Sequence, residues 1–148
     1  MLSISHALTG AFISSKIPNP LIATPLILVS HYIEDWIIHW DVGTGLTNGS
    51  RKRRDAFLLE IGDMLLAFFL VLVFFQVGKQ TLQVNIWYGA FIGLLPDFVE
   101  APRNFFHYNP WFLKPFNTFH HYMHHSTPNM ILGLLPQFVV VGLIFLLK

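Results

Sequence analysis

Long apolar stretches, separated by turns and prolines, divide this chain into helical segments. Residues 57–77 carry only two charges, Glu60 and Asp63, both near the start of the stretch, and residues 130–147 carry none. Because an α-helix rises 1.5 Å per residue, about 20 apolar residues are enough to cross the hydrocarbon core of a bilayer. Both stretches therefore predict membrane-spanning helices.

Three further helices are predicted from the remaining sequence. A short first helix ends before residues 18–20, which read Pro-Asn-Pro, because proline cannot donate a hydrogen bond within a helix. A second helix is expected over 21–40 and a fourth over 84–100. Residues 41–55 are rich in Gly, Asn and Thr and predict a loop. Residues 101–129 hold four prolines, so we expect only one or two helical turns there, around residues 120–125.

The composition narrows the class of protein. Of 148 residues, 53% are hydrophobic and 11% are charged, whereas soluble domains carry about 25% charged residues. A soluble globular domain, a disordered chain and a nucleic-acid-binding protein are therefore excluded. The chain has no cysteine, which excludes thiolate nucleophiles and sulfur-ligated clusters. We expect one all-α domain over 1–148, a polytopic membrane bundle of four to five helices.

The polar residues are distributed unevenly along the predicted up-and-down path. If successive helices alternate in direction, all eight histidines and all eight acidic residues fall at one end of the bundle. Lys16, Lys79 and Lys148 fall at the other end. Cytoplasmic loops carry the excess of Lys and Arg, so we expect the polar end to face the cytoplasm. Six basic residues lie at that end: Arg51, Lys52, Arg53, Arg54, Arg103 and Lys114.

The end of the second predicted helix has the spacing of a metal-binding helix. His31, Asp35 and His39 follow one another at intervals of four residues, and side chains four apart lie above one another on a helix, as in metalloprotease zinc helices. His31 and Asp35 can therefore share one ion. His31 and His39 are about 12 Å apart along the axis, too far to bind the same ion. We expect His39 to serve a second ion, an outer contact or the substrate.

A second cluster places four imidazoles within six residues: His120, His121, His124 and His125. If helical, this stretch contains two pairs with a spacing of four residues. Mixed histidine and carboxylate ligands without sulfur favour zinc, manganese or iron over magnesium or calcium. The candidate ligands outnumber those of one tetrahedral zinc, so two or more ions are expected.

Glu60 and Asp63 lie three residues apart on one helical face, where two carboxylates repel each other unless a cation or a proton lies between them. Together with His39 they are candidates for a catalytic base. The plainer interpretation is a polar cluster that shares a proton, or exposure among lipid headgroups. Arg103 is a candidate phosphate ligand, with an ion pair to Glu100 three residues before it as the alternative.

Three motifs resemble the bacterial membrane-bound metal-dependent hydrolases, which are small inner-membrane proteins. They are Ser5-His6 with Gly10, Gly93-Leu-Leu-Pro-Asp97, and the run from His120 to Ser126. The spacing of His31, Asp35 and His39 is faintly similar to the zinc-dependent phospholipase C and P1 nuclease group. The resemblance implies a multi-pass inner-membrane location, with Glu100 in place of a family Asp. The metal ligands that it implies are His6, His31, Asp35, Asp97 and His125, with His120 beside them.

These observations predict a membrane-bound, metal-dependent hydrolase. We expect a divalent cofactor, zinc first and manganese or iron as alternatives, and a phosphoester in a lipid or lipid-linked substrate. Two other hypotheses stay open. One is a membrane di-iron oxygenase, because His121-x2-His124-His125 matches one histidine box of the desaturases, although the other boxes are missing. The second is a metal-binding or sensing membrane protein without catalytic activity.

Overall fold

The computed structural model describes residues 1–148 and contains six helices and no strand. The prediction of an all-α fold is confirmed. The helices are α1 (Ser3–Lys16), α2 (Pro20–Trp36), α3 (Arg53–Val71), α4 (Val84–Phe106), α5 (Lys114–Met123) and α6 (Met130–Leu147), and a π-helical turn over Leu72–Gln76 continues α3.

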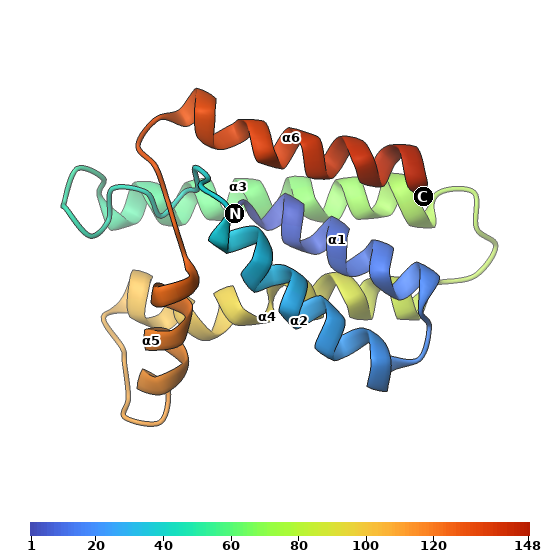
Figure 1. The fold of residues 1–148 in the computed structure, drawn as a ribbon, viewed down its shortest axis with the longest axis horizontal. Helices are drawn as coiled ribbons and strands as arrows, with labels where there is room; N and C mark the ends of the chain where they lie inside the picture. The colour runs from blue at the N-terminus through green and yellow to red at the C-terminus, as the bar shows by residue number, and fades with distance from the viewer.

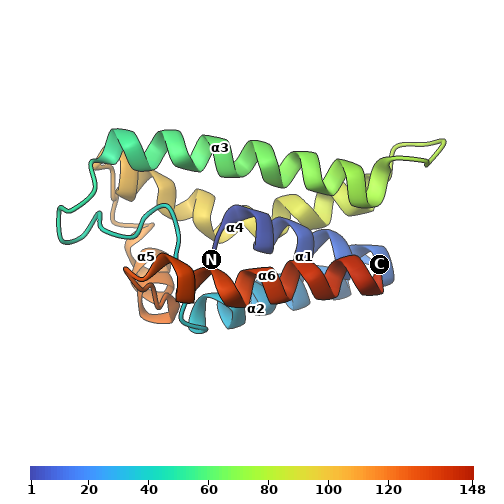
Figure 2. The ribbon, with the colours of Figure 1, turned by 90° about the horizontal axis from the view of Figure 1, so that it is seen from above.

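Five of the helices run up and down along the long axis of the molecule, and α5 lies across one end (Figures 1 and 2). The start of α1, the end of α2, the start of α3 and the end of α4 meet at that same end, which we call the polar end. The innermost helix is α1, which packs against α2, α3, α4 and α6. The up-and-down path therefore brings residues distant in the sequence to one end of the bundle.

Small residues allow α1 and α4 to approach each other closely. A Cβ atom added at Gly89 would lie 2.3 Å from the backbone oxygen of Gly10, and one added at Gly93 would lie 2.3 Å from that of His6. Glycines at such crossings are typical of helices packed within membranes. The crossing fixes the histidine of α1 beside the turn of α4 that precedes Asp97.

The second helix ends earlier than the sequence predicts, at Trp36 and not at residue 40. The backbone of Ile37 is extended, and the following residues bond to a distant segment. His39 N donates to His125 O at 3.1 Å, and Thr127 N donates to His39 O at 2.8 Å. These bonds satisfy the backbone groups that a longer helix would have paired, so His39 projects from an extended segment.

The fourth helix is longer than predicted and includes Pro96 and Pro102. Each proline removes a single N–H donor, a loss that the packing of α4 against α1, α3 and α5 offsets. It ends at Phe106, and the next residue, His107, is in the left-handed conformation with φ of 57°. Tyr108 N then donates to Pro102 O at 3.0 Å.

The cluster of four histidines in residues 120–125 is not one continuous helix. The prediction of two histidine pairs spaced by four residues on a helix is therefore wrong. Pro115 lies in the first turn of α5, where a missing N–H costs little. The helix ends at Met123, and His124 is already extended. Only His120 and His121 therefore lie on a helix.

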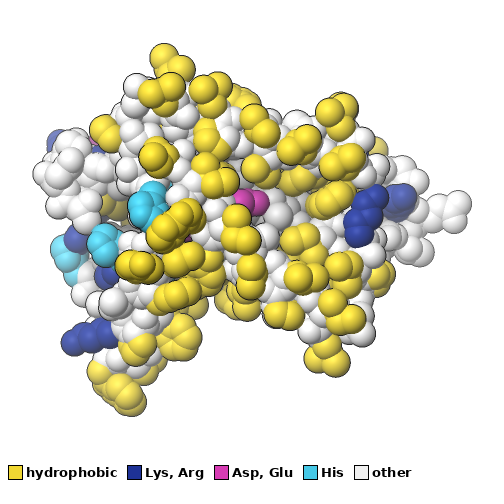
Figure 3. All heavy atoms as spheres, viewed as in Figure 1, with side chains coloured by type: hydrophobic (Ala, Val, Ile, Leu, Met, Phe, Trp, Pro, Cys, Tyr) yellow, Lys and Arg dark blue, Asp and Glu magenta, His cyan; other side chains and the backbone are white.

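Two helices are long and apolar enough to cross a membrane, the continuous Arg53–Gln76 and Met130–Leu147. In the most apolar part of each, 17% of the residues are buried within the molecule, so most of their side chains face outward. On the face shown in Figure 3, hydrophobic side chains cover much of the surface between the two ends. The number of crossing helices beyond these two stays a prediction.

The close crossing of α1 and α4 can be tested with a pair of glycine substitutions. Gly89→Ala should lower the stability of the purified protein in detergent by about 1–3 kcal/mol, because the added methyl group overpacks the crossing. Gly62→Ala on α3 meets no atom within 4 Å, so it should be neutral or stabilising by up to about 1 kcal/mol. Thermal unfolding of both variants checks the difference, and equal effects would contradict the packing described.

Candidate metal centre

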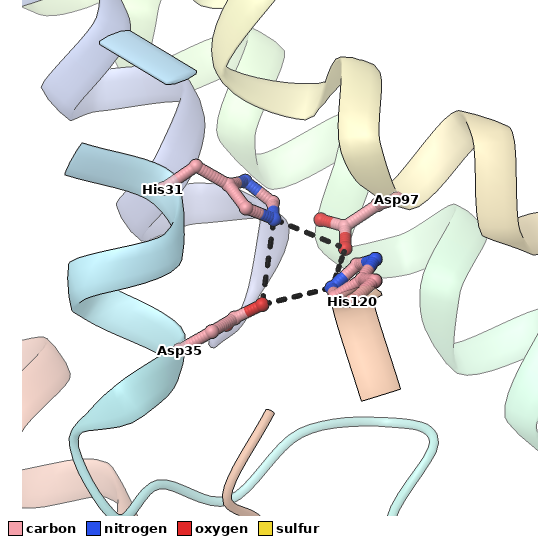
Figure 4. A group of neighbouring side chains, drawn as sticks. All are labelled: His31, Asp35, Asp97 and His120. Atoms are coloured by element: carbon pink, nitrogen blue, oxygen red, sulfur yellow. Dashed lines mark hydrogen bonds and ion pairs between the residues drawn. The ribbon is translucent and has the colours of Figure 1, made fainter. Parts of the chain in front are cut away.

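Four side chains from three helices converge at the polar end of the bundle (Figure 4). His31 and Asp35 come from α2, Asp97 from α4 and His120 from α5, and their ligand atoms all lie within 4.8 Å of one another. His31 Nε2 lies 3.4 Å from Asp35 Oδ2 and 3.7 Å from Asp97 Oδ1. His120 Nε2 lies 2.9 Å and 3.6 Å from the same two oxygens. We call these four residues the first group.

These separations fit a small divalent ion. Donor atoms bound to one zinc at about 2.0 to 2.2 Å are about 3.3 to 3.6 Å apart in a tetrahedron. The four distances, 2.9 to 3.7 Å, bracket that range. Two imidazoles and two carboxylates are a ligand set that zinc, manganese and iron accept. The first group could therefore hold one metal ion with little movement of its side chains.

The hydrogen bonds of His31 direct its free nitrogen into the first group. His31 Nδ1 lies 2.7 Å from Gly93 O, and because a carbonyl can only accept, this nitrogen carries the proton. Nε2 then presents its lone pair to the carboxylates and has no hydrogen-bond partner although it is buried. A lone pair facing carboxylate oxygens is favourable only with a positive charge between them. Metal-ligating histidines are commonly oriented by a carbonyl in this way.

A second group lies on the other side of the same carboxylate. Asp35 Oδ1, His39 Nε2 and His124 Nε2 form it; the two imidazole nitrogens are 3.1 Å apart, and His39 Nε2 is 3.8 Å from Asp35 Oδ1. Asp41 Oδ2 lies 3.0 Å from His124 Nε2 and 3.3 Å from His39 Nε2. His39 Nδ1 donates to Ile37 O at 2.7 Å, so Nε2 again faces the group with its lone pair.

Asp35 joins the two groups, because Oδ2 belongs to the first and Oδ1 to the second. The residue is fully buried. His6 Nε2 also lies 3.1 Å from Oδ1, and the N-terminal ammonium of Met1 contacts the same oxygen. Each oxygen of the Asp35 carboxylate faces a different set of imidazole nitrogens, so this carboxylate is suited to bridge two cations.

The pKa values of residues outside the five up-and-down helices reflect the same electrostatics. Burial lowers the pKa of His39, and the nearby ammonium lowers it further, which favours the neutral imidazole that binds metals. Burial alone would raise the pKa of Asp41, but the His124 imidazole beside it holds that pKa well below its ordinary value. Burial would lower the pKa of His120, yet its bond to Asp35 and the charge of Asp97 raise it overall. The centre therefore favours positive charge beside ionised carboxylates.

Outer contacts orient the ligands. His6 Nδ1 lies 2.9 Å from Glu34 Oε2, and Thr9 Oγ1 donates to the other oxygen of Glu34. His120 Nδ1 faces Glu100 Oε2 at 3.9 Å. Histidine ligands backed by carboxylates are more basic and fixed in orientation. Sequence reasoning had missed Glu34 and Asp41, although each lies within two residues of a proposed ligand, Asp35 and His39.

Several predicted site residues lie outside both groups. Glu100 pairs with Arg103 and accepts from Asn104 Nδ2, so it is an outer contact of His120. His125 is exposed and packs edge-on against Trp36, with ring centroids 4.5 Å apart. His121 is exposed as well. The structure therefore does not bring together the three histidines of the desaturase-like box.

The two carboxylates of α3 bind the start of α1. Ser3 Oγ donates to Glu60 Oε1 and Ser3 N donates to Asp63 Oδ2, each at 2.6 Å. Negative charge at a helix N-terminus is stabilising, because the first N–H groups have no partner within the helix. Asp63 is buried there, whereas Glu60 also borders a cavity that reaches the metal-binding groups.

That cavity has a volume of about 350 Å³ and is lined by His124 of the second group, by Asp41 beside it and by Asp97 of the first group. Arg103 lines it as well. Such a volume is in the range of small-molecule sites. A ligand in the cavity would thus lie against both groups.

Comparisons with protein-family models, curated proteins and solved structures found no match to this chain. The resemblance to membrane-bound metal-dependent hydrolases therefore stays a prediction from three short motifs.

Metal content is the direct test of the centre. After incubation with zinc and desalting, the purified protein should retain two ions per chain, and Asp35→Asn should retain almost none because both groups lose their shared ligand. Asp97→Asn should lose one ion, since Asp97 belongs only to the first group. Elemental analysis measures the ratios.

His107→Asn is the matched control, because His107 is exposed and asparagine tolerates its left-handed backbone. Its metal content should equal that of the unmodified protein. Unchanged zinc in Asp35→Asn would contradict the assignment of the ligands.

Proposed function

We propose that this protein is a membrane-bound, metal-dependent hydrolase that cleaves a phosphoester of a lipid or lipid-linked substrate. The observation that carries the proposal is the pair of metal-binding groups that share Asp35 and border one cavity. When bound, ions such as zinc would activate water and stabilise the negative charge that develops on the leaving oxygen. We favour zinc as the cofactor, with manganese and iron as alternatives.

The cavity separates this proposal from a storage or structural role. Structural metal sites are closed by protein ligands, whereas catalytic sites keep an open position for water or substrate. Asp41, Asp97 and His124 line a cavity, which supports an accessible centre. The di-iron oxygenase hypothesis has less support, because His121 and His125 lie outside both groups.

Two residues of the cavity have roles in the proposed reaction. Arg103 Nη2 pairs with Glu100, and its guanidinium remains partly exposed in the cavity, where it would bind a phosphate oxygen. Glu60 would orient the attacking water or accept its proton, since it borders the cavity. Asp63 would act through Ser3, by holding the start of α1 in position.

The proposed location is the inner membrane, crossed several times, with the polar end in the cytoplasm. Support comes from the outward-facing apolar residues of the two long helices and from the six Lys and Arg at the polar end. The helix that lies across this end, α5, buries Asn117 and His120 and exposes Phe116, Phe119 and Tyr122. Such an amphipathic helix suits the surface of a bilayer.

Hydrolysis of a panel of phospholipids and isoprenoid phosphates tests the proposal. Protein purified in detergent and loaded with zinc or manganese should release phosphate or a phosphorylated headgroup from at least one of them. Asp97→Asn should reduce kcat by about 100-fold or more, the loss expected when one stabilising charge is removed. His107→Asn should retain full activity.

The proposal would be wrong if metal-loaded protein left every phosphoester intact. Turnover that required iron and oxygen would support the oxygenase instead.

Single cysteines test the orientation, because the chain contains none of its own. A membrane-impermeant maleimide should label Lys79→Cys in intact cells, since residue 79 lies in the turn at the end opposite the centre. Ser50→Cys, in the loop at the polar end, should react only after permeabilisation. The reverse pattern would place the polar end outside the cytoplasm.

A further inference from the structure

The cavity beside the metal centre is bordered by one face of α3 and one face of α4. From α3 it is lined by Phe57, Glu60, Ile61 and Met64, whose spacing of three and four residues marks a single helical face. From α4 it is lined by residues including Asp97, Phe98, Ala101, Asn104 and Phe105. The two helices lie side by side (Figure 2), so the cavity is a groove between them.

The lining of the groove combines two kinds of side chain. Asp41, Asp97, His124 and Arg103 are polar. Ile61 of α3 and Phe98 of α4 are among its apolar residues. Phe57 of α3 also packs against α4, because its ring centroid lies 5.4 Å from that of Phe105. A ligand that fills the groove must therefore have both a polar and a hydrocarbon part.

Two apolar residues of α3 that line the groove are also partly exposed. Ile61 and Phe57 line the groove and are 42% and 37% exposed. Both belong to Arg53–Gln76, one of the two helices able to cross a membrane. A hydrocarbon chain would therefore pass from the bilayer into the groove without crossing water, which avoids the cost of exposing apolar surface.

The charges of the polar end indicate the headgroup. Asp41, Glu60, Asp97 and Glu100 line the groove with one guanidinium, that of Arg103. A free anion would be repelled by this excess of carboxylates, but metal ions in the two groups reverse the balance and attract it. A phosphate oxygen would then be held between those ions and the guanidinium of Arg103.

We propose that the groove between α3 and α4 binds one hydrocarbon chain of an amphiphile whose phosphate head lies between Arg103 and the metal-binding groups. This inference rests on the proposed function for the identity of the head. The placement of the chain rests on the lining residues alone.

Photo-crosslinking tests the placement of the chain without requiring turnover. The probe is a long-chain alkyl phosphate with a diazirine in the chain, added to the full-length, zinc-loaded protein in detergent. Mass spectrometry should find the label on residues 57–64 of α3 and 98–105 of α4. Ile61→Trp should reduce this labelling at least tenfold, because the indole fills the groove.

Leu59→Trp is the matched control. Leu59 lies two residues away on the same helix, is 47% exposed and does not line the groove. This variant should be labelled like the unmodified protein. Equal zinc content and equal melting temperatures of the two variants establish that both are folded.

The outcomes separate the groove from the proposed reaction. Labelling in the groove together with failure to hydrolyse any phosphoester would uphold the binding site and refute the hydrolase. Hydrolysis of phosphoesters with labelling outside α3 and α4, or equal labelling of Ile61→Trp and Leu59→Trp, would refute the groove.

Discussion

The carboxylate of Asp35 is the group on which the polar end depends. It is fully buried, and an isolated ionised carboxylate in such surroundings would be strongly unfavourable. Four imidazole Nε2 atoms, from His6, His31, His39 and His120, lie within 3.8 Å of its two oxygens. Because these histidines come from three helices and one extended segment, compensating this charge requires the tertiary structure.

The packing of the bundle and the geometry of the centre are therefore coupled. Gly93 contacts the backbone of His6 and offers its own carbonyl to His31 Nδ1. One residue thus permits the close approach of α1 and α4 and also fixes the direction in which His31 presents its lone pair. Glu60 and Asp63 hold the start of α1 from the other side through Ser3. The packing of α1, α2, α3 and α4 against one another thus positions the few side chains that form the metal-binding groups.

Local sequence signals were sufficient for much of this architecture. The apolar segments, the Pro-Asn-Pro break and the alternation of direction predicted the helices and the convergence of polar residues at one end. His31 and Asp35 share a helical face as their spacing indicates. The last helix, α6, spans the predicted residues, 130–147.

What the sequence could not indicate depends on contacts between distant segments. The end of α2 at Trp36 follows from backbone bonds that join residues 35 and 39 to residues 125 and 127, which no local propensity encodes. The same pairing draws His124 to His39 and leaves His125 outside. Likewise, α4 continues past Glu100, where packing against α3 and α5 offsets the loss of a donor at Pro102.

Anomalous diffraction from crystals of the zinc-loaded protein tests the central claim most directly. The account predicts two zinc peaks, one beside each oxygen of Asp35, the first contacting His31, Asp97 and His120 and the second contacting His39 and His124. Zinc bound elsewhere, or no ordered zinc near Asp35, would contradict the claim that this carboxylate bridges two metal ions.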